Sequence, residues 1–416
     1  MNDILPEGAP LWERLESAAA AIFDSYGYQR IRIPVLERTE LFSRSIGEAT
    51  DIVEKEMYTF EDRNGESVTL RPEATAGVVR ASLSNGLLHN QQQKLWCSGP
   101  MFRREKPQKG RYRQFHQLSV EALGFADPEI DAELIAMSAR LWRELGLESV
   151  VLELNSLGTL ESRASYRQVL LEYFSQHKNA LDEDSVRRLE RNPLRILDSK
   201  NPDMRELIAA APLLTGYLDS ESRDHFERVQ ALLADVDIEF TINPRLVRGL
   251  DYYTRTVFEW VTDRLGAQSA VCSGGRYDGL VAQLGGRDTP AVGWALGIER
   301  VVEVIRAEGA DVPAAAADVY LVSVGDEARR RAFTVAEQLR DRVPGLKLSI
   351  GIPSAGFKAQ LRRADKSGAA FAVIIGESEL AVDRLSVKPL REAAAQELLA
   401  LEEFAARLRA RTRMVA

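Results

Sequence analysis

The chain has 416 residues, of which 45% are hydrophobic and 28% charged, and its formal net charge at pH 7 is −8. A chain of this size can bury large cores and is expected to form two or three domains. The acidic balance argues against indiscriminate binding of polyanions, although residues 317–416 hold 17 basic against 13 acidic side chains. A mildly basic C-terminal unit of this kind is compatible with contact to RNA.

The two cysteines and four histidines are scattered, without the spacing of a zinc site or a disulfide framework. The acidic N-terminus lacks the apolar segment of a secretory signal, and no apolar run approaches the roughly 18 residues of a membrane span. We therefore expect a reduced, cytoplasmic enzyme or binding protein with no membrane contact and no metal site of its own.

The N-terminal part is predicted to begin with an amphipathic helix over residues 10–27. A strand, Ile31–Leu36, follows, and Pro34 restricts it to an edge, a bulge or a subunit boundary. Residues 56–70 form a predicted hairpin with an Asn-Gly turn. The next segment, Arg71–Gly77, leads into a helix, so its polar side chains are expected near a helix N-terminus.

The most informative stretch is residues 102–117, which we interpret as two strands around a loop with proline and glycine. It carries six lysines and arginines and a single acid, Glu105. Period-2 alternation in the second strand places one set of side chains on a common face: Arg111, Arg113, Phe115, Gln117, Ser119 and Glu121. From Phe115 to Glu121 that face spans about 20 Å, which suits an extended ligand with phosphate, base and polar ends. The alternative is a solvated, charged edge hairpin.

The middle of the chain contains a region of different composition. Residues 127–147 are predicted to form a helix and Val150–Leu154 a strand. Residues 156–237 are mostly helical and polar, which indicates an inserted helical subdomain. Strands are predicted to resume at Ile238–Ile242 and Tyr252–Val261.

The C-terminal part begins with a glycine-rich turn at Cys272–Gly279, followed by Gly293–Arg300, which opens a helix running to about residue 306. Residues 307–317 form a linker by composition. Strands and helices then alternate up to a last helix from about Arg391. We therefore expect a small α/β domain with a largely parallel sheet over residues 318–416.

Several common catalytic motifs are absent from the sequence. It contains no P-loop, no dinucleotide-binding fingerprint, no nucleophile elbow and no HExxH motif. What remains is a chain rich in arginines placed beside strands, and arginine gives permanently charged, bidentate recognition of phosphates and carboxylates.

Three segments together resemble the signature motifs of a class II aminoacyl-tRNA synthetase. The helix and strand around Pro34 resemble motif 1, the basic hairpin motif 2, and the helix opening at Glu299-Arg300 motif 3. Two further stretches, Arg245–Trp260 and Gly274–Leu280, narrow the resemblance to histidyl-tRNA synthetases of the bacterial type. The resemblance covers essentially the whole chain, and its five motifs occur in the family's order.

The resemblance implies an α+β catalytic domain over residues 1–312, built on an antiparallel sheet as in the class II synthetase fold. A helical insertion at 156–237 interrupts it and is implied to clasp the acceptor stem of tRNA(His). After the linker at 307–317, residues 318–416 are implied to form an α/β anticodon-binding domain. In the hairpin loop, the side chains implied to touch the tRNA acceptor end are Lys106, Gln108 and Lys109.

The resemblance also implies how ATP is bound. Arg103 corresponds to the contact with the α-phosphate and Arg111 to that with the distal phosphates, while Glu105 supports the base or phosphate end. Phe115 is implied to stack on adenine, with Arg300 on its other side or at the γ-phosphate. The alternation above agrees for Arg111 and Phe115. The alternatives are a core aromatic for Phe115 and a helix-surface charge for Arg300.

Histidine recognition requires partners for a neutral imidazole, which has one N–H donor and one acceptor. In the family's pattern Glu121 accepts from one ring nitrogen and Tyr253 complements the other, although a solvated strand-end acid is the alternative for Glu121. The pattern implies an α-amino site at Glu73 and Thr75, and a carboxylate site at Gln117 and Arg248. The full set implied to bind histidine is Glu73, Thr75, Gln117, Glu121, Arg248, Tyr252 and Tyr253.

The implied reaction has two steps. Histidine attacks ATP, with Mg²⁺ bound to the distal phosphates, to give histidyl-adenylate and pyrophosphate, and histidine then passes to the 3′ end of the tRNA. Arg103 and Arg248 are the implied catalytic residues, and Arg248 reaches the α-phosphate where other class II enzymes place a metal ion. A guanidinium there stabilises charge developing on the phosphoryl oxygens. No side chain stands out as general base.

The family further implies a homodimer joined partly through the N-terminal helix and the Pro34 strand. The chain departs from the family's pattern at Ala295, at Trp294, and at its start, which lacks an Arg-Gly pair and is expected to be trimmed or misannotated. Two other hypotheses stay open: a non-catalytic regulatory subunit of ATP phosphoribosyltransferase and an RNA-binding module. The first typically loses the C-terminal domain and the histidine motifs, which this chain keeps.

Overall fold

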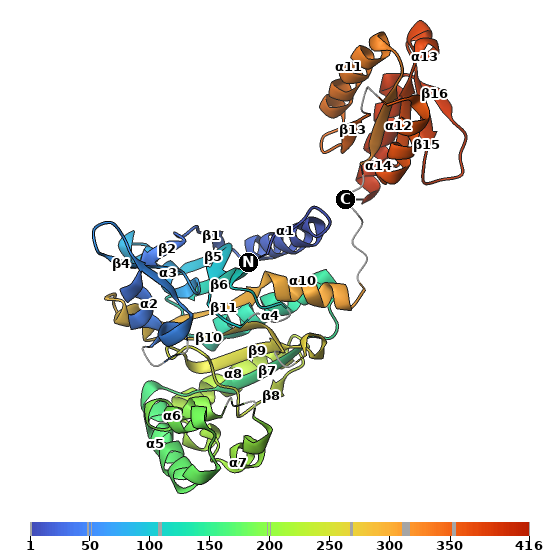
Figure 1. Cartoon of the computed structure of the whole chain (residues 1–416). Coiled ribbons are helices and arrows are strands. Elements are labelled where there is room, and N and C mark those ends of the chain that lie inside the picture. Colours follow the sequence, from blue (N-terminus) through green and yellow to red (C-terminus); the bar gives the residue numbers. More distant parts are fainter. Residues whose placement is uncertain are drawn as a thin grey trace. The chain divides into compact units, whose positions relative to one another are not determined.

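The computed structural model describes residues 2–47, 50, 52–106, 110–197, 199, 201–266, 269–309, 317–351 and 355–415. The chain divides into two compact units, Met1–Ala310 and Asp311–Ala416 (Figure 1). Most of the predicted linker, residues 310–316, lies outside the described residues. Within the described ranges, none of the helices combines the length and the hydropathy that a membrane span requires.

The first unit is built on an eight-stranded sheet in the order β1-β5-β6-β11-β10-β9-β7-β8. The strands are β1 (Gln29–Arg30), β5 (Gln93–Phe102), β6 (Gln114–Leu123), β11 (Ala291–Gly297), β10 (Ala270–Arg276), β9 (Thr254–Val261), β7 (Val151–Ser156) and β8 (Thr241–Ile242). All neighbouring strands are antiparallel except the outermost pairs, β1 with β5 and β7 with β8. The predicted antiparallel sheet is confirmed.

Three helices pack together beside this sheet: α1 (Ala9–Ser25), α4 (Pro128–Leu145) and α10 (Ile298–Ala307) (Figure 1). The predicted N-terminal helix is confirmed, with a buried stripe at helical spacing that includes Leu11, Leu15 and Ala19. Phe23 of α1 meets the rings of Trp96 and Trp294 edge to face at 5.3 and 5.6 Å. The bulk of Trp294 is therefore accommodated in the core.

A separate three-stranded sheet, β2-β4-β3, contains the hairpin predicted over residues 56–70, which is confirmed. Its strands are β2 (Leu36–Arg38), β3 (Tyr58–Glu61) and β4 (Ser67–Leu70), with the helices α2 (Thr39–Ile46) and η1 (Ile52–Glu56) between β2 and β3. Asp62 holds the hairpin turn by accepting from two backbone N–H groups, of Asn64 and Glu66. Helix α3 (Thr75–Ser84) follows β4.

The strand predicted at Ile31–Leu36 is wrong, because only Leu36 of that range lies in a strand. Pro34 has no N–H to donate to a ladder, and the guanidinium of Arg71 takes the place of a neighbouring strand. It donates to the carbonyls of Ile33 at 2.9 Å and Pro34 at 3.2 Å, and on its other side to Pro100 at 2.9 Å. A single side chain thus satisfies backbone groups that sheet pairing would otherwise satisfy.

The helical insertion lies beyond the β7–β8 side of the sheet (Figure 1). Its α-helices are α5 (Leu160–Gln176), α6 (Glu183–Arg191), α7 (Arg205–Ala210) and α8 (Ser220–Ala234), with the short helix η3 (Pro193–Ile196) after α6. Helix α8 packs against α4. The strand predicted at Ile238–Ile242 is shorter than expected, since only β8 forms there.

Two glycine-rich predictions are also corrected. The supposed turn at Cys272–Gly279 is largely strand β10, and the helix expected from Gly293 begins only at Ile298, after β11. The glycines permit close approach of strands rather than a turn: a Cβ on Gly274 would lie 2.5 Å from the Gly293 carbonyl oxygen.

The second unit is an α/β domain with strand order β13-β12-β14-β15-β16. Its elements are β12 (Val319–Ser323), α11 (Asp326–Arg342), β13 (Leu348–Ile350), α12 (Phe357–Lys366), β14 (Phe371–Ile375), α13 (Glu377–Val382), β15 (Leu385–Pro389), β16 (Glu397–Leu399) and α14 (Leu401–Val415). Strand β12 is parallel to both its neighbours, but β14, β15 and β16 pair antiparallel. The sheet is therefore mixed, and the last helix starts ten residues later than predicted.

Candidate active site

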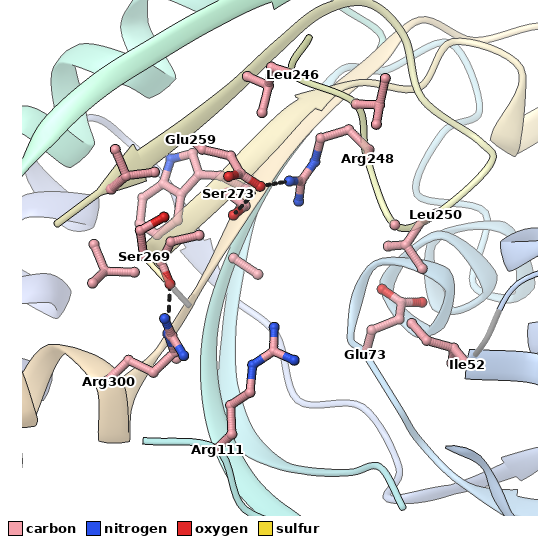
Figure 2. Close-up of a pocket in the computed structure, with 18 of the residues that line it drawn as sticks. Ile52, Glu73, Arg111, Leu246, Arg248, Leu250, Glu259, Ser269, Ser273 and Arg300 are labelled. Carbon is pink, nitrogen blue, oxygen red and sulfur yellow. Dashed lines mark hydrogen bonds and ion pairs between the residues drawn. The ribbon is translucent and has the colours of Figure 1, made fainter. Parts of the chain in front are cut away.

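A cavity of about 660 Å³ opens over the middle of the eight-stranded sheet (Figure 2). Its volume suits a small-molecule site. Nearly all the residues predicted to bind histidine or ATP line it: Glu73, Thr75, Arg103, Glu105, Arg111, Phe115, Gln117, Arg248, Tyr252, Tyr253 and Arg300. Segments from β6, the start of α3, the loop before β9 and the start of α10 thus converge on one space.

Glu121 lies directly behind this lining. It is 1% exposed, so it is not a solvated strand-end acid, and its carboxylate accepts a hydrogen bond from the hydroxyl of Thr75 at 2.7 Å and another from the hydroxyl of Tyr277. The carboxylate rests against β11, where a Cβ on Gly293 would collide with it. Glycine at position 293 therefore leaves the room that Glu121 occupies.

Burial governs the titration of this acid. Desolvation raises the pKa of Glu121 to about 8, although the hydrogen bonds from Tyr277 and Thr75 act in the opposite direction. Burial also raises the pKa of Tyr277 well above its usual value. The hydroxyl consequently stays a donor to Glu121 over the physiological pH range.

Glu73 sits at the start of α3 and is also buried. Its two carboxylate oxygens accept from the backbone N–H groups of Thr75 at 2.6 Å and Ala76 at 2.9 Å. The acid thus satisfies donors that a helix N-terminus leaves open, where negative charge is favourable. Burial nevertheless raises the pKa of Glu73, because desolvation is the largest influence on it.

Arg248 occupies the loop before β9 and points into the cavity, where it forms an ion pair with Glu259 of β9 (Figure 2). Its guanidinium carbon lies 5.3 Å from the ring centre of Tyr253. Burial alone would lower the pKa of Arg248, but Glu259 and Tyr253 outweigh that influence and the pKa is raised. Arg248 is therefore a permanent cation held at the centre of the site.

The hairpin supplies a second charged cluster. Arg111 pairs with Glu105 at 2.7 Å, and Arg103 lies 3.8 Å from the same carboxylate. The Nε of Arg103 donates to the Pro72 carbonyl at 2.8 Å, and its guanidinium carbon lies 5.3 Å from the ring centre of Phe115. One acid thus faces two cations here, which leaves a net positive charge on this cluster.

Arg300 lines the same cavity as Arg111 (Figure 2). It is only 9% exposed, which excludes a helix-surface charge, and its Nε donates to the Ala270 carbonyl at 2.6 Å. Burial and, secondarily, the positive charge of Arg111 lower the pKa of Arg300 to about 10. The two cations repel one another, and an anion bound between them would reduce that repulsion.

The Oε1 of Gln117 and the Nε of Arg248 are buried polar atoms of the lining, and neither has a hydrogen-bond partner among the described residues. Buried polar groups in proteins are normally paired. The oxygen can accept a hydrogen bond from a polar ligand in the cavity, and the Nε–H can donate one to it.

Not every predicted residue reaches the cavity. Arg113 is exposed and does not line it, because β6 begins at Gln114 and the alternation does not extend back to position 113. Lys106 is exposed and likewise outside the lining, while Gln108 and Lys109 lie outside the described residues.

The sequence reading missed three side chains that shape the site. Tyr277 holds Glu121, Glu259 pairs with Arg248, and Glu299 accepts from the backbone N–H of His116 at 2.9 Å. Tyr277 and Glu259 belong to the two histidine-specific stretches, and this membership is the one sequence feature that could have pointed to them. The partner of Tyr277 lies on β6 and that of Glu259 in the loop before β9, so the sequence does not reveal these contacts.

The antiparallel sheet, with an arginine-bearing hairpin, a carboxylate on the same strand and an arginine at the start of the following helix, defines a class II aminoacyl-tRNA synthetase fold and site. The family model of histidyl-tRNA synthetase matches residues 1–301, and the model of the anticodon binding domain matches residues 318–411. The chain belongs to the histidyl-tRNA synthetase family.

Similar proteins support this membership along the whole chain. The histidine–tRNA ligase of Halorhodospira halophila is 58% identical over 408 residues, 98% of this chain and 96% of that protein. The histidine–tRNA ligase of Alkalilimnicola ehrlichii is 56% identical over 409 residues, 98% of this chain and 95% of that protein. The crystal structure of apo S. aureus histidyl-tRNA synthetase is 35% identical, with a TM-score of 0.81 over 98% of each chain.

Proposed function

We propose that the cavity carries out both steps of histidine–tRNA ligation, with histidine at its Glu121 end and ATP at its hairpin end. Ligation of histidine to tRNA, with ATP as a substrate, is the activity of the family. The observation that supports the arrangement is the order of charge along one cavity: a buried carboxylate behind Thr75, then Arg248, then the cluster of Arg103, Arg111 and Arg300.

At the histidine end, Glu121 reads the imidazole. In the ionised form its two oxygens offer about four acceptor positions, and the hydroxyls of Thr75 and Tyr277 use two of them. An imidazole N–H can therefore be added without breaking either bond. The hydroxyl of Tyr253 faces the second ring nitrogen, with Tyr252 packed against it at 4.7 Å between ring centres.

The remaining groups of histidine meet residues of matching charge. Glu73 and Thr75 bind the α-amino group, because the Glu73 carboxylate is the acid that lines this end of the cavity. Gln117 through its amide N–H groups and Arg248 through its guanidinium bind the α-carboxylate, and the Nε–H of Arg248 is a buried donor without a partner among the described residues. Arg248 also stabilises the charge that develops on the α-phosphate during attack.

At the ATP end, Arg103 contacts the α-phosphate and Arg111 the distal phosphates, with Glu105 supporting this end. Phe115 stacks on adenine, and Arg300 closes the site from the other side. Mg²⁺ enters bound to the distal phosphates as part of the substrate. Glu105 and Glu299 line this part of the cavity, and carboxylate oxygens are among the ligands that Mg²⁺ takes.

The remaining parts of the chain serve tRNA(His) and assembly. We propose that Lys106, Gln108, Lys109 and the helical insertion contact the acceptor end, that residues 318–416 bind the anticodon, and that the protein works in the cytoplasm as a homodimer. Val35, Leu36 and Phe60 support dimerisation near Pro34, because these apolar side chains are 37, 43 and 50% exposed.

The test is ATP–pyrophosphate exchange with each of the twenty amino acids in turn. We expect exchange with histidine alone, because buried polar partners reject ligands that leave them unpaired, by roughly 10⁴-fold or more. A folded protein without histidine-dependent exchange would contradict the proposal. It would favour the alternative of a regulatory subunit. That alternative is the less supported one, because relatives that are 56–58% identical are named as ligases.

A further inference from the structure

The loop at residues 245–253 carries Arg248, Tyr252 and Tyr253 but contains no helix or strand. An irregular segment has to satisfy its backbone carbonyls by other means. Several of these carbonyls accept hydrogen bonds from side chains of other segments. Most of these donors belong to the helical insertion. The shape of the histidine end therefore depends on residues outside the cavity lining.

Arg163 of α5 makes the closest of these contacts. One nitrogen of its guanidinium donates to the carbonyls of Asp251 at 2.9 Å and Tyr253 at 2.6 Å, which flank Tyr252. Burial lowers the pKa of Arg163, yet an arginine remains charged at neutral pH. A charged donor shared by two carbonyls fixes the backbone on both sides of a tyrosine of the site.

Two further residues of the insertion hold the same loop. The amide of Asn192 donates to the side chain of Asp251 at 2.9 Å, and Arg195 donates to the carbonyl of Arg248 at 3.2 Å. On the opposite side, the N–H of Asp251 donates to the carbonyl of Ile46 at the end of α2. The loop is thus held between the insertion and the body of the catalytic unit.

We propose that Arg163 is a positioning residue for histidine recognition, so that the helical insertion is a structural part of the amino-acid site. Arg163 does not line the cavity, and it acts by holding the backbone that presents Tyr252 and Tyr253. The inference rests on the proposed histidine site. It assigns the insertion a role in the first step of the reaction, before tRNA is involved.

The experiment compares Arg163→Met, which keeps the aliphatic stem but loses the donors, with Arg163→Lys, which keeps the charge. ATP–pyrophosphate exchange gives KM for histidine and KM for ATP separately, and thermal unfolding gives Tm. We expect Arg163→Met to raise KM for histidine about tenfold or more, because a charged hydrogen-bond donor is lost, while KM for ATP stays within twofold. Arg163→Lys should restore part of the loss.

The matched control is Arg187→Met, since Arg187 lies on α6 of the same insertion with its side chain 64% exposed, and it should leave both constants unchanged. A KM for histidine within twofold of wild type in folded Arg163→Met would overturn the proposal, as would equal rises in both constants. If that variant does not fold, Asn192→Ala is tested in its place, and we expect a severalfold rise in KM for histidine with KM for ATP unchanged.

Failure of the proposed function gives a different result, because wild-type protein would then show no histidine-dependent exchange.

Discussion

The two ends of the cavity, proposed above to take histidine and ATP, differ in burial and in how their charges are held. The histidine end is buried, and its acids are held by neutral donors: Glu121 by Thr75 and Tyr277, and Glu73 by backbone N–H groups. The ATP end is partly exposed and rich in cations, with the side chain of Arg111 40% exposed and paired with Glu105.

The difference follows from the ligands. A neutral imidazole differs from other side chains only in where its donor and acceptor lie, so its recognition needs fixed polar groups shielded from water, where an unpaired group is costly. A triphosphate carries high charge, so permanent cations suffice even where water enters. The contrast predicts that substitutions at the buried end have large effects and that those at the exposed end have small ones.

The largest expected effect is that of Glu121→Gln. The amide puts an NH2 group in place of one carboxylate oxygen, so it presents N–H to one of the two hydroxyls that donate to Glu121 and keeps only one oxygen that can accept. We expect kcat/KM for histidine in ATP–pyrophosphate exchange to fall about 10³-fold, near the discrimination that buried polar sites achieve, with KM for ATP little changed.

The control for Glu121→Gln is Glu133→Gln on α4, which loses an ion pair with Lys94 at 2.7 Å outside the cavity. It should leave both constants within about twofold, because partly exposed ion pairs contribute little. A loss below tenfold in Glu121→Gln, or equal losses for both substrates, would contradict the assignment of Glu121 to the imidazole.

Arg248→Ala tests the boundary between the two ends. We expect the rate of adenylate formation to fall about 10²- to 10³-fold, the usual effect of removing a group that stabilises transition-state charge, while the Kd for ATP changes much less. Pre-steady-state adenylate formation and equilibrium ATP binding measure the two quantities.

The control is Glu259→Gln, which breaks the same ion pair but keeps the guanidinium, so the rate of adenylate formation should fall less than tenfold. Equal losses in rate and ATP affinity in Arg248→Ala would contradict a transition-state role.

Arg111→Ala should have a smaller effect, because the lost cation is partly exposed and is already paired with Glu105. We expect KM for ATP to rise about tenfold, equivalent to roughly 1.4 kcal/mol, with KM for histidine unchanged. Arg113→Ala is the matched control from the same hairpin, since Arg113 is exposed and does not line the cavity. If the two variants behave alike, Arg111 contributes only to the general positive charge of the hairpin.

Arg113 also shows where prediction from the sequence reaches its limit. Alternation placed Phe115, Gln117 and Glu121 correctly because β6 is a regular strand over Gln114–Leu123. It failed for Arg113, which precedes the first residue of the strand. Local periodicity thus determined one face of the site, but only within the element that has that periodicity.

Contacts between segments that are distant in the chain could not be predicted from the sequence alone. Gly274 and Gly275 suggested a turn, whereas they lie in a strand whose neighbours leave no room for a Cβ. Tyr277 reaches Glu121 across 156 positions, and Arg163 reaches the loop of Asp251 and Tyr253 across about 90. Such pairings depend on the order of strands in the sheet and on the docking of the insertion, which no local pattern encodes.

The last prediction concerns stability, and it follows from the titration of Glu121. Its folded-state pKa of about 8 lies above the ordinary 4.5, so between these values the native state binds more protons than the unfolded state. The resulting contribution to the free energy of unfolding is present below pH 4.5 and is lost as the pH rises through 8. Glu121→Gln removes this contribution.

Urea denaturation at intervals between pH 5 and 9 measures the effect. We expect the stability of wild type relative to Glu121→Gln to fall with rising pH, at a slope of at most about 1.4 kcal/mol per pH unit. Glu73, whose pKa is also raised, is present in both proteins, so its titration largely cancels in the difference. A constant difference would mean that the pKa of Glu121 is not raised by folding within this range, and that the two ends of the cavity differ less in hydration than their burial indicates.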